Sequence, residues 1–110
     1  MVVNKNNTQF PKEGSNGAFK RQQSMFRDFV SIESKYKPEN NRYHLYLSYA
    51  CPWAHRTLIT VVLKELESVV SISFVNPIRD EKGWRFDPQN SQYTDTINGF
   101  DYLIEAYKRM

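Results

Sequence analysis

The stretch YHLYLSYACPWAHRTLI, residues 43–59, decides the predicted fold. The side chains of residues 43–48 alternate between two faces, and nearly all are aromatic, bulky or apolar, which predicts a strand covered on both faces. After a short loop, Pro52 suits the first position of a helix, where its fixed φ helps and its missing N–H leaves no bond unmade. A helix from about 52 to 66 is predicted by an apolar stripe of Ala54, Leu58, Val61, Val62 and Leu66.

A second strand is predicted after this helix. Residues 69–75, VVSISFV, are rich in β-branched side chains, and Asn76 with Pro77 ends the run. Strand, helix and strand in this order form the right-handed unit of a parallel sheet. The predicted fold class is therefore α/β.

Two segments precede this βαβ unit. Residues 1–16 are polar, which indicates a flexible amino-terminal arm. Residues 17–31, GAFKRQQSMFRDFVS, have phenylalanines at near-helical spacing. This pattern favours either a short docking helix or an ordered arm.

The end of the chain is predicted to be a loop over 76–92 followed by a helix from about Thr94. The apolar face of that helix would consist of Ile97, Phe100, Ile104 and Tyr107. A two-stranded sheet is marginally stable alone. Residues 17–110 are therefore interpreted as the first part of a larger domain.

Composition limits the kind of protein. With 110 residues, the chain is one small domain or part of one. No apolar run approaches the roughly 18 residues that cross a bilayer, so we expect a cytoplasmic protein with no membrane partner. The net charge of +3 is mild, and only three basic residues interleave with the aromatics of 17–31, so we expect no nucleic-acid partner.

Cys51 is the single cysteine of the chain and lies at the predicted start of the helix. Unpaired backbone N–H groups and the positive end of the helix dipole favour an anion at such a position, which suits a nucleophilic thiolate. Arg56, with His55 before it, lies about one turn further on and would add positive potential if both side chains pointed back. The other interpretation is a small packed cysteine without chemistry.

The tetrapeptide CPWA, residues 51–54, narrows the mechanism of a reactive thiol. In a Cys-x-x-Cys motif the second thiol resolves a mixed disulfide, but Ala54 occupies that place here. A small thiol from solution would have to resolve it, and glutathione is the obvious candidate. This chemistry predicts a glutathione-dependent monothiol enzyme that needs no metal and no bound cofactor, with glutathione as co-substrate.

Four segments resemble a known family in their order and spacing: NGAFKRQQSMFRDFV, RYHLYLSYACPWAHRTLI, VSISFVNP and EKGWRFDP. They resemble the amino-terminal half of the glutathionyl-hydroquinone reductases, the Xi class of glutathione transferases, which is related to the omega class. The resemblance covers nearly everything after about residue 16. Its most specific part is the combination of CPWAHRTLI with KGWRF.

The resemblance implies an architecture. Residues 17–110 would form an incomplete thioredoxin-like domain. In the family, the chain continues with third and fourth strands and a helical second domain, and the full-length protein forms a homodimer. The family's Val-Pro-Val segment and the Glu-Ser pair that follows it, which bind glutathione, come after the part of the family that these 110 residues match. We therefore expect the 110 residues alone to be inactive or nearly so.

The resemblance also implies roles for single residues. Cys51 would be the catalytic nucleophile and Trp84 would pack over bound glutathione, although the residues alone also fit Trp84 as a plain loop anchor. Pro52, Trp53 and Arg56 would support the site, with Trp53 shaping its entrance. Tyr46 and Tyr49 are assigned to the core or the pocket wall.

The implied reaction is the reduction of glutathionyl-hydroquinones to hydroquinones through a Cys51-glutathione mixed disulfide. One alternative is an omega-like thioltransferase or dehydroascorbate reductase that uses the same cysteine. Another is a non-catalytic chain that binds a partner through an exposed sheet edge and the arm at 17–30.

Overall fold

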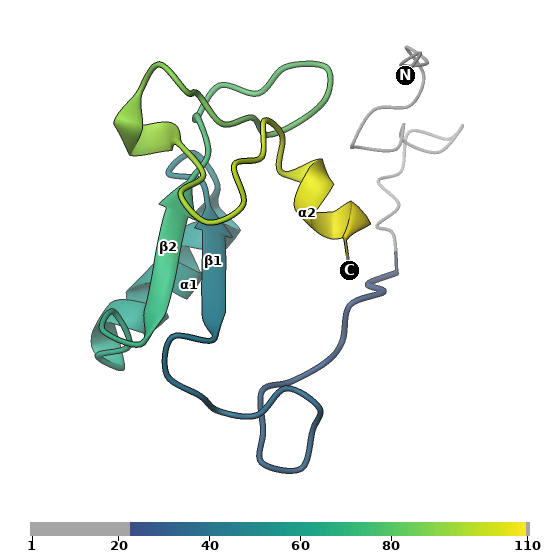
Figure 1. Cartoon of the computed structure of the whole chain (residues 1–110), viewed down its shortest axis with the longest axis vertical. Coiled ribbons are helices and arrows are strands. Elements are labelled where there is room, and N and C mark those ends of the chain that lie inside the picture. The colour runs from purple at the N-terminus through teal and green to yellow at the C-terminus, as the bar shows by residue number, and fades with distance from the viewer. Residues whose placement is uncertain (1–22, 110) are drawn as a thin grey trace.

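The computed structural model describes residues 23–109, and it confirms the predicted strand-helix-strand unit (Figure 1). The predicted arm at 1–16 lies outside the described residues. The elements are β1 Tyr43–Leu47, α1 Pro52–Leu63, β2 Val70–Phe74, the short 3-10 helix η1 Ser91–Tyr93, and α2 Ile104–Lys108. None of the helices within 23–109 has the length and apolar character needed to cross a membrane.

The two strands form a parallel two-stranded sheet. The register pairs Tyr43 with Val70 and continues to Leu47 with Phe74. Figure 1 shows α1 on one face of the strands and the chain that leads into α2 on the other. Only Leu47 of β1 and Ser73 of β2 are buried, so the sheet is covered in part, and less than the bulky alternating residues of β1 predict.

Helix α1 ends three residues before the predicted end at 66. Glu65 adopts the left-handed conformation with φ 55°. Its N–H bonds the carbonyl of Val62 at 3.1 Å, and the N–H of Leu66 bonds the carbonyl of Val61 at 2.9 Å. These two bonds form a Schellman motif, which closes a helix. Glycine is usual at the left-handed position, so Glu65 gave no stop signal in the sequence.

The predicted helix from Thr94 is wrong over its first ten residues. The carboxylate of Asp95 accepts backbone N–H bonds from Ile97, Asn98 and Phe100 at 3.0–3.2 Å. These bonds fold residues 95–100 into a loop, because side-chain acceptors compete with helical hydrogen bonds. Only Ile104–Lys108 is α-helical.

The segment before the sheet is an ordered arm rather than a helix in its described part. Residues 23–29 have no helical or strand structure, and Val30 forms an isolated bridge with Tyr36. The ring of Phe26 lies 5.8 Å from the ring of Tyr107 on α2. The arm therefore contacts the element at the other end of the chain.

The core is small and combines apolar and polar side chains. Leu47, Val61, Val75 and Phe86 are its buried hydrophobic members among the described residues. Tyr46 packs edge-on against Phe86 at 5.6 Å and donates its hydroxyl to the carboxylate of Asp95, at 3.1 and 3.2 Å from the two oxygens. Asp95 is buried, and burial raises its pKa, but the backbone N–H bonds outweigh that effect and the pKa lies below its ordinary value.

His44 joins the two strands through both ring nitrogens. Nδ1 lies 2.6 Å from the hydroxyl of Ser71 and Nε2 lies 2.9 Å from that of Ser73. Burial lowers the pKa of His44, and the charge of Asp95 opposes this without reversing it. The neutral ring is therefore the form that the fold favours.

Acid should weaken the fold through His44. Because the folded-state pKa lies below the unfolded value of about 6.5, the neutral ring contributes stability above that pH, and the contribution is lost as pH falls through the folded-state pKa. Urea midpoints measured between about pH 7.5 and about pH 5 should decrease. His44→Gln should flatten this slope, whereas His55→Gln on the exposed face of α1 should not. Equal slopes in all three proteins would contradict the assignment.

Candidate active site

Cys51 is the N-cap residue of α1, as predicted from its place before Pro52. Its backbone is extended, with φ −102° and ψ 114°, and its carbonyl accepts the first helical bond from His55 at 3.0 Å. The thiol makes no capping hydrogen bond, and the residue is half-buried. The sulfur thus lies at the amino terminus of a helix, where backbone N–H groups have no helical partner, and takes no part in the cap.

The loop between β1 and α1 fixes the position of Cys51. The buried hydroxyl of Ser48 accepts a bond from the N–H of Ala50 at 3.2 Å, and the Ser48 carbonyl accepts the N–H of Cys51 at 3.2 Å. Tyr49 stacks on Phe74 of β2, with ring centroids 4.1 Å apart and planes 6° apart. The loop is therefore tied to both strands.

Cys51 lies in a pocket of about 360 Å³ that also contains two tryptophans. Trp53 comes from the first turn of α1, and Trp84 comes from the long loop after β2. The remaining lining residues are Leu45, Tyr46, Leu47, Ser48, Ala54, Thr57, Val75, Leu103 and Tyr107. Three residues singled out from the sequence are thus brought together by the fold.

Trp84 is held in this pocket by its backbone and by its neighbours. Its carbonyl accepts the N–H of Leu103 at 3.0 Å, just before α2. The guanidinium of Arg79 lies 4.8 Å from the centre of the indole, within cation-π range. The preceding residue, Gly83, has φ 100°, a conformation that residues with a side chain rarely adopt.

The two remaining supporting residues lie outside the pocket wall. The guanidinium of Arg56 lies 5.1 Å from the ring of Trp53, so it acts on the pocket through that ring. Pro52 is at the first helical position and sets the start of α1. Trp53 itself is 63% exposed, which fits a side chain at the pocket entrance.

Sequence reasoning missed part of the pocket wall. Thr57 lies one turn after Trp53, and i+4 helical spacing from Trp53 could have identified it. Leu103 and Tyr107 arrive from the carboxyl-terminal segment. No local sequence signal connects that segment to Cys51, because the contact depends on how the loop after β2 folds.

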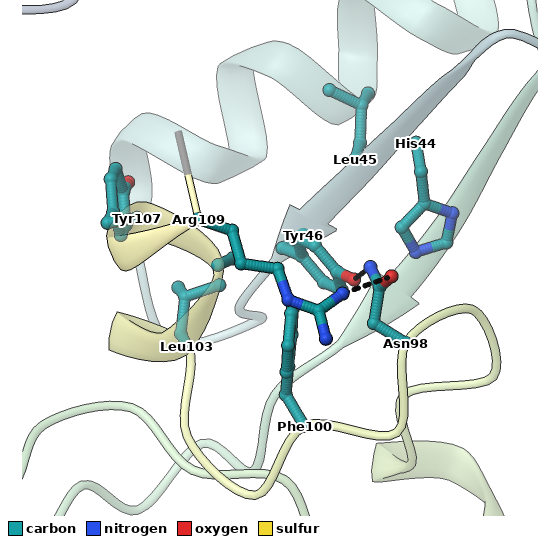
Figure 2. Close-up of a pocket in the computed structure, with 9 residues that line it drawn as sticks. His44, Leu45, Tyr46, Asn98, Phe100, Leu103, Tyr107 and Arg109 are labelled. Carbon is teal, nitrogen blue, oxygen red and sulfur yellow. Dashed lines mark hydrogen bonds between the residues drawn. The ribbon is translucent and has the colours of Figure 1, made fainter.

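A second pocket of about 400 Å³, drawn in Figure 2, shares part of its lining with the Cys51 pocket. Leu45, Tyr46, Leu103 and Tyr107 line both pockets. In the second pocket, Asn98 connects Tyr46 with Arg109: its amide donates to the Tyr46 hydroxyl at 2.8 Å and accepts from the Arg109 guanidinium at 3.4 Å (Figure 2).

A third pocket of about 710 Å³ lies between α1, β1 and the segment from Val30 to Asn40. The second and third pockets are both larger than the pocket that contains Cys51. We choose the Cys51 pocket as the candidate active site because it holds the thiol of the single cysteine, and its volume plays no part in the choice. Over residues 23–109, no three His, Cys, Asp or Glu side chains are grouped so that they could hold a metal ion.

Comparison with known proteins agrees with this geometry. The chain is 49% identical over 94 residues to Glutathione S-transferase omega-like 2 of Schizosaccharomyces pombe, covering 84% of this chain and 30% of that protein. The fold superposes on a glutathione transferase Xi from Phanerochaete chrysosporium with a TM-score of 0.77 and 39% identity, over 84% of this chain and 32% of that one. The chain is a homologue of the Xi-class glutathione transferases.

Two further similar proteins support this assignment. Glutathionyl-hydroquinone reductase PcpF of Sphingobium chlorophenolicum is 43% identical over 98 residues, which are 89% of this chain and 31% of that protein. A Xi glutathione transferase of Saccharomyces cerevisiae, solved in complex with glutathione, superposes with a TM-score of 0.74 at 37% identity, over 81% and 35% of the two chains. No family model matches the chain.

The chain spans about 30% of the length of the curated relatives that it matches first. The shared part is their amino-terminal region, and its parallel βαβ unit matches part of their thioredoxin-like domain. The predicted family and fold class are therefore confirmed.

Proposed function

We propose that this chain supplies the nucleophile of a glutathione-dependent monothiol oxidoreductase that reduces glutathionyl-hydroquinones to hydroquinones. The observation that carries the proposal is the pocket in which the single cysteine, at the amino terminus of α1, lies with Trp84. Homology to Xi-class glutathione transferases, one of them solved with glutathione bound, supports this choice of thiol.

The proposed reaction has two steps. The Cys51 thiolate attacks the glutathione sulfur of the substrate, the bond from that sulfur to the aromatic ring breaks, and the ring carbon takes a proton to give the hydroquinone. A second glutathione thiolate then attacks the glutathione sulfur of the mixed disulfide, which releases oxidised glutathione and restores the Cys51 thiolate. Overall, the thioether sulfur of the substrate and the thiol sulfur of the added glutathione each give up one electron as they join in a disulfide, and the ring carbon takes both electrons with the proton, so the balance requires no metal.

Trp84 and Trp53 have binding roles in this proposal. Trp84 would pack against bound glutathione from the wall of the pocket, and Trp53 with Arg56 stacked on it would form the entrance. The presence of a single cysteine fits a reducing compartment such as the cytoplasm, where glutathione is supplied. We further propose a homodimer for a protein of the length of its relatives, to be tested by light scattering.

A substrate panel tests the function. The chain, and a chimaera in which it replaces the matching part of the Schizosaccharomyces pombe relative, would be assayed with a glutathionyl-hydroquinone, a glutathione mixed disulfide and dehydroascorbate. We expect the chimaera to prefer the glutathionyl-hydroquinone by about tenfold or more in kcat/KM, because only that substrate places an aromatic leaving group beside the tryptophans. We expect the chain alone to show little turnover.

Each other result of the panel selects a different function. A preference for the mixed disulfide or for dehydroascorbate would replace the proposal with an omega-like thioltransferase or reductase. No turnover of any substrate by the chimaera, with the unmodified relative active, would favour a non-catalytic chain that binds a partner.

A further inference from the structure

Trp84 follows a tight turn that a single carboxylate organises. The backbone groups of Asp80 and Gly83 bond each other reciprocally at 3.2 and 3.0 Å. The Asp80 carboxylate also accepts the N–H of Lys82 at 2.8 Å. The turn at residues 80–83 is thus closed by both the backbone and the side chain of Asp80.

The same carboxylate is bonded from the other end of the chain. The hydroxyl of Tyr102 donates to Oδ2 of Asp80 at 2.6 Å, a link across 22 positions of sequence. The Lys82 ammonium lies 5.3 Å from the centre of the Tyr102 ring. Tyr102 immediately precedes Leu103, whose N–H bonds the Trp84 carbonyl. The turn and the residue after it are therefore fixed to one segment just before α2.

The charge state of the link agrees with its geometry. The Tyr102 hydroxyl lowers the pKa of Asp80, and the Asp80 carboxylate raises the pKa of Tyr102. The acceptor is therefore ionised and the donor protonated at neutral pH. A hydrogen bond to an ionised acceptor is stronger than one between neutral groups.

We propose that Tyr102 and Asp80 are positioning residues for Trp84: their bond fixes the turn at 80–83 and so keeps the indole in the wall of the Cys51 pocket. Arg79, which lies over the Trp84 ring, precedes the same turn, so loss of the bond would release both the indole and its cation-π partner. The consequence for glutathione rests on the proposed function, whereas the position of Trp84 does not.

Fluorescence of Trp84 tests the structural half of the proposal. The chain contains two tryptophans, so every protein in the series carries Trp53→Phe to leave Trp84 as the single emitter. Tyr102→Phe removes only the hydroxyl. We expect it to increase acrylamide quenching of Trp84 roughly twofold, because a turn freed of its tether opens more often.

Tyr43→Phe is the matched control. The Tyr43 hydroxyl makes a bond of the same length, 2.6 Å, but to the carbonyl of Lys37, and Tyr43 does not line the Cys51 pocket. Quenching should not change in this variant. Asp80→Asn, which keeps an acceptor oxygen but not the charge, should lie between the parent and Tyr102→Phe, and Asp80→Ala, which also removes the acceptor of the Lys82 N–H, should be quenched at least as much as Tyr102→Phe. Equal quenching in Tyr102→Phe and Tyr43→Phe would overturn the proposal.

Cys51 chemistry tests the functional half. Glutathione disulfide would be the first probe: the Cys51 thiolate attacks one sulfur, the S–S bond breaks, and glutathione leaves as a thiolate. Tyr102→Phe should slow this reaction about threefold to tenfold, the range of one hydrogen bond, and leave alkylation by iodoacetamide within about twofold. If alkylation slowed as much as glutathionylation, the substitution would have altered the reactivity of Cys51 in general, and the proposed positioning role of Tyr102 would be contradicted.

The positioning of Trp84 and its effect on glutathionylation of Cys51 can be refuted independently of each other. A change in Trp84 quenching without any effect on glutathionylation would support the tether and contradict the proposed role of Trp84 in glutathione binding. Parallel changes in both readouts, restored by Asp80→Asn relative to Asp80→Ala, would support the whole proposal.

Discussion

Cys51→Ser should abolish glutathionyl transfer, with a loss on the order of a thousandfold or more in the chimaera described above. A serine hydroxyl is not ionised at neutral pH and cannot form a disulfide, so the first step of the proposed reaction loses its nucleophile and the mixed disulfide that the second step consumes never forms. The backbone cap should be unaffected, because the thiol makes no capping bond. Stopped assays of hydroquinone release, with urea midpoints as a check on folding, would measure the effect.

A displaced thiol is the control for this prediction. Lys64 is the C-cap residue at the opposite end of α1, and it is exposed. Adding Lys64→Cys to Cys51→Ser restores the number of thiols but places the sulfur at the negative end of the helix dipole, away from the tryptophans. We expect no recovery. Turnover restored by Lys64→Cys would show that the pocket around Cys51 is not required.

Phe86→Ala should cost about 3–5 kcal/mol in the free energy of unfolding, the range for a buried phenylalanine. Phe86 is 4% exposed, packs edge-on against Tyr46, and donates its backbone N–H to Asp101 at 2.8 Å. Since domains are stable by only about 5–15 kcal/mol, this loss should remove a large share of the total free energy of unfolding. Urea unfolding followed by circular dichroism would measure it.

Phe29→Ala makes the same chemical change at a site that is 80% exposed. It should alter the free energy of unfolding by no more than about 0.5 kcal/mol, because no packed neighbour is lost. If the two variants unfolded at the same urea concentration, the small core around Phe86 would not be what stabilises this chain.

The central βαβ unit could be predicted because its signals are local. Alternation of large side chains over 43–48, proline at the first helical position and the β-branched run at 69–75 each decide the structure of their own segment. The strands at Tyr43–Leu47 and Val70–Phe74 agree with the predictions to within one residue at each end. The position of Cys51 at the helix start follows from the same local rules.

The errors arise where side chains override periodicity. The apolar spacing after Thr94 is helical, yet Ile97 and Ile104 are largely exposed and do not share one buried face. Three backbone N–H groups are bound instead by the Asp95 carboxylate, whose partner Tyr46 lies 49 positions away. No local pattern reveals such a long-range acceptor.

The wall of the Cys51 pocket shows the same limit. Trp84 could be nominated from family resemblance, but its place beside Cys51 depends on bonds to Leu103 and, through Asp80, to Tyr102. Each of these joins segments about 20 residues apart across an irregular loop. Their partners could be found only once the loop after β2 had been placed in three dimensions.

Peptide mass mapping after exposure to a glutathionyl-hydroquinone is the most direct test of Cys51 as the nucleophile that accepts glutathione. The chimaera and the native chain would each be treated with substrate, sampled, and then treated with glutathione. We predict that in the chimaera the peptide containing Cys51 gains one glutathione as one hydroquinone is released, that added glutathione removes it, and that the chain alone gains little. A thiol that remains unmodified in the native chain and in the chimaera, and reacts only after denaturation, would contradict the account and identify Cys51 as a packing residue.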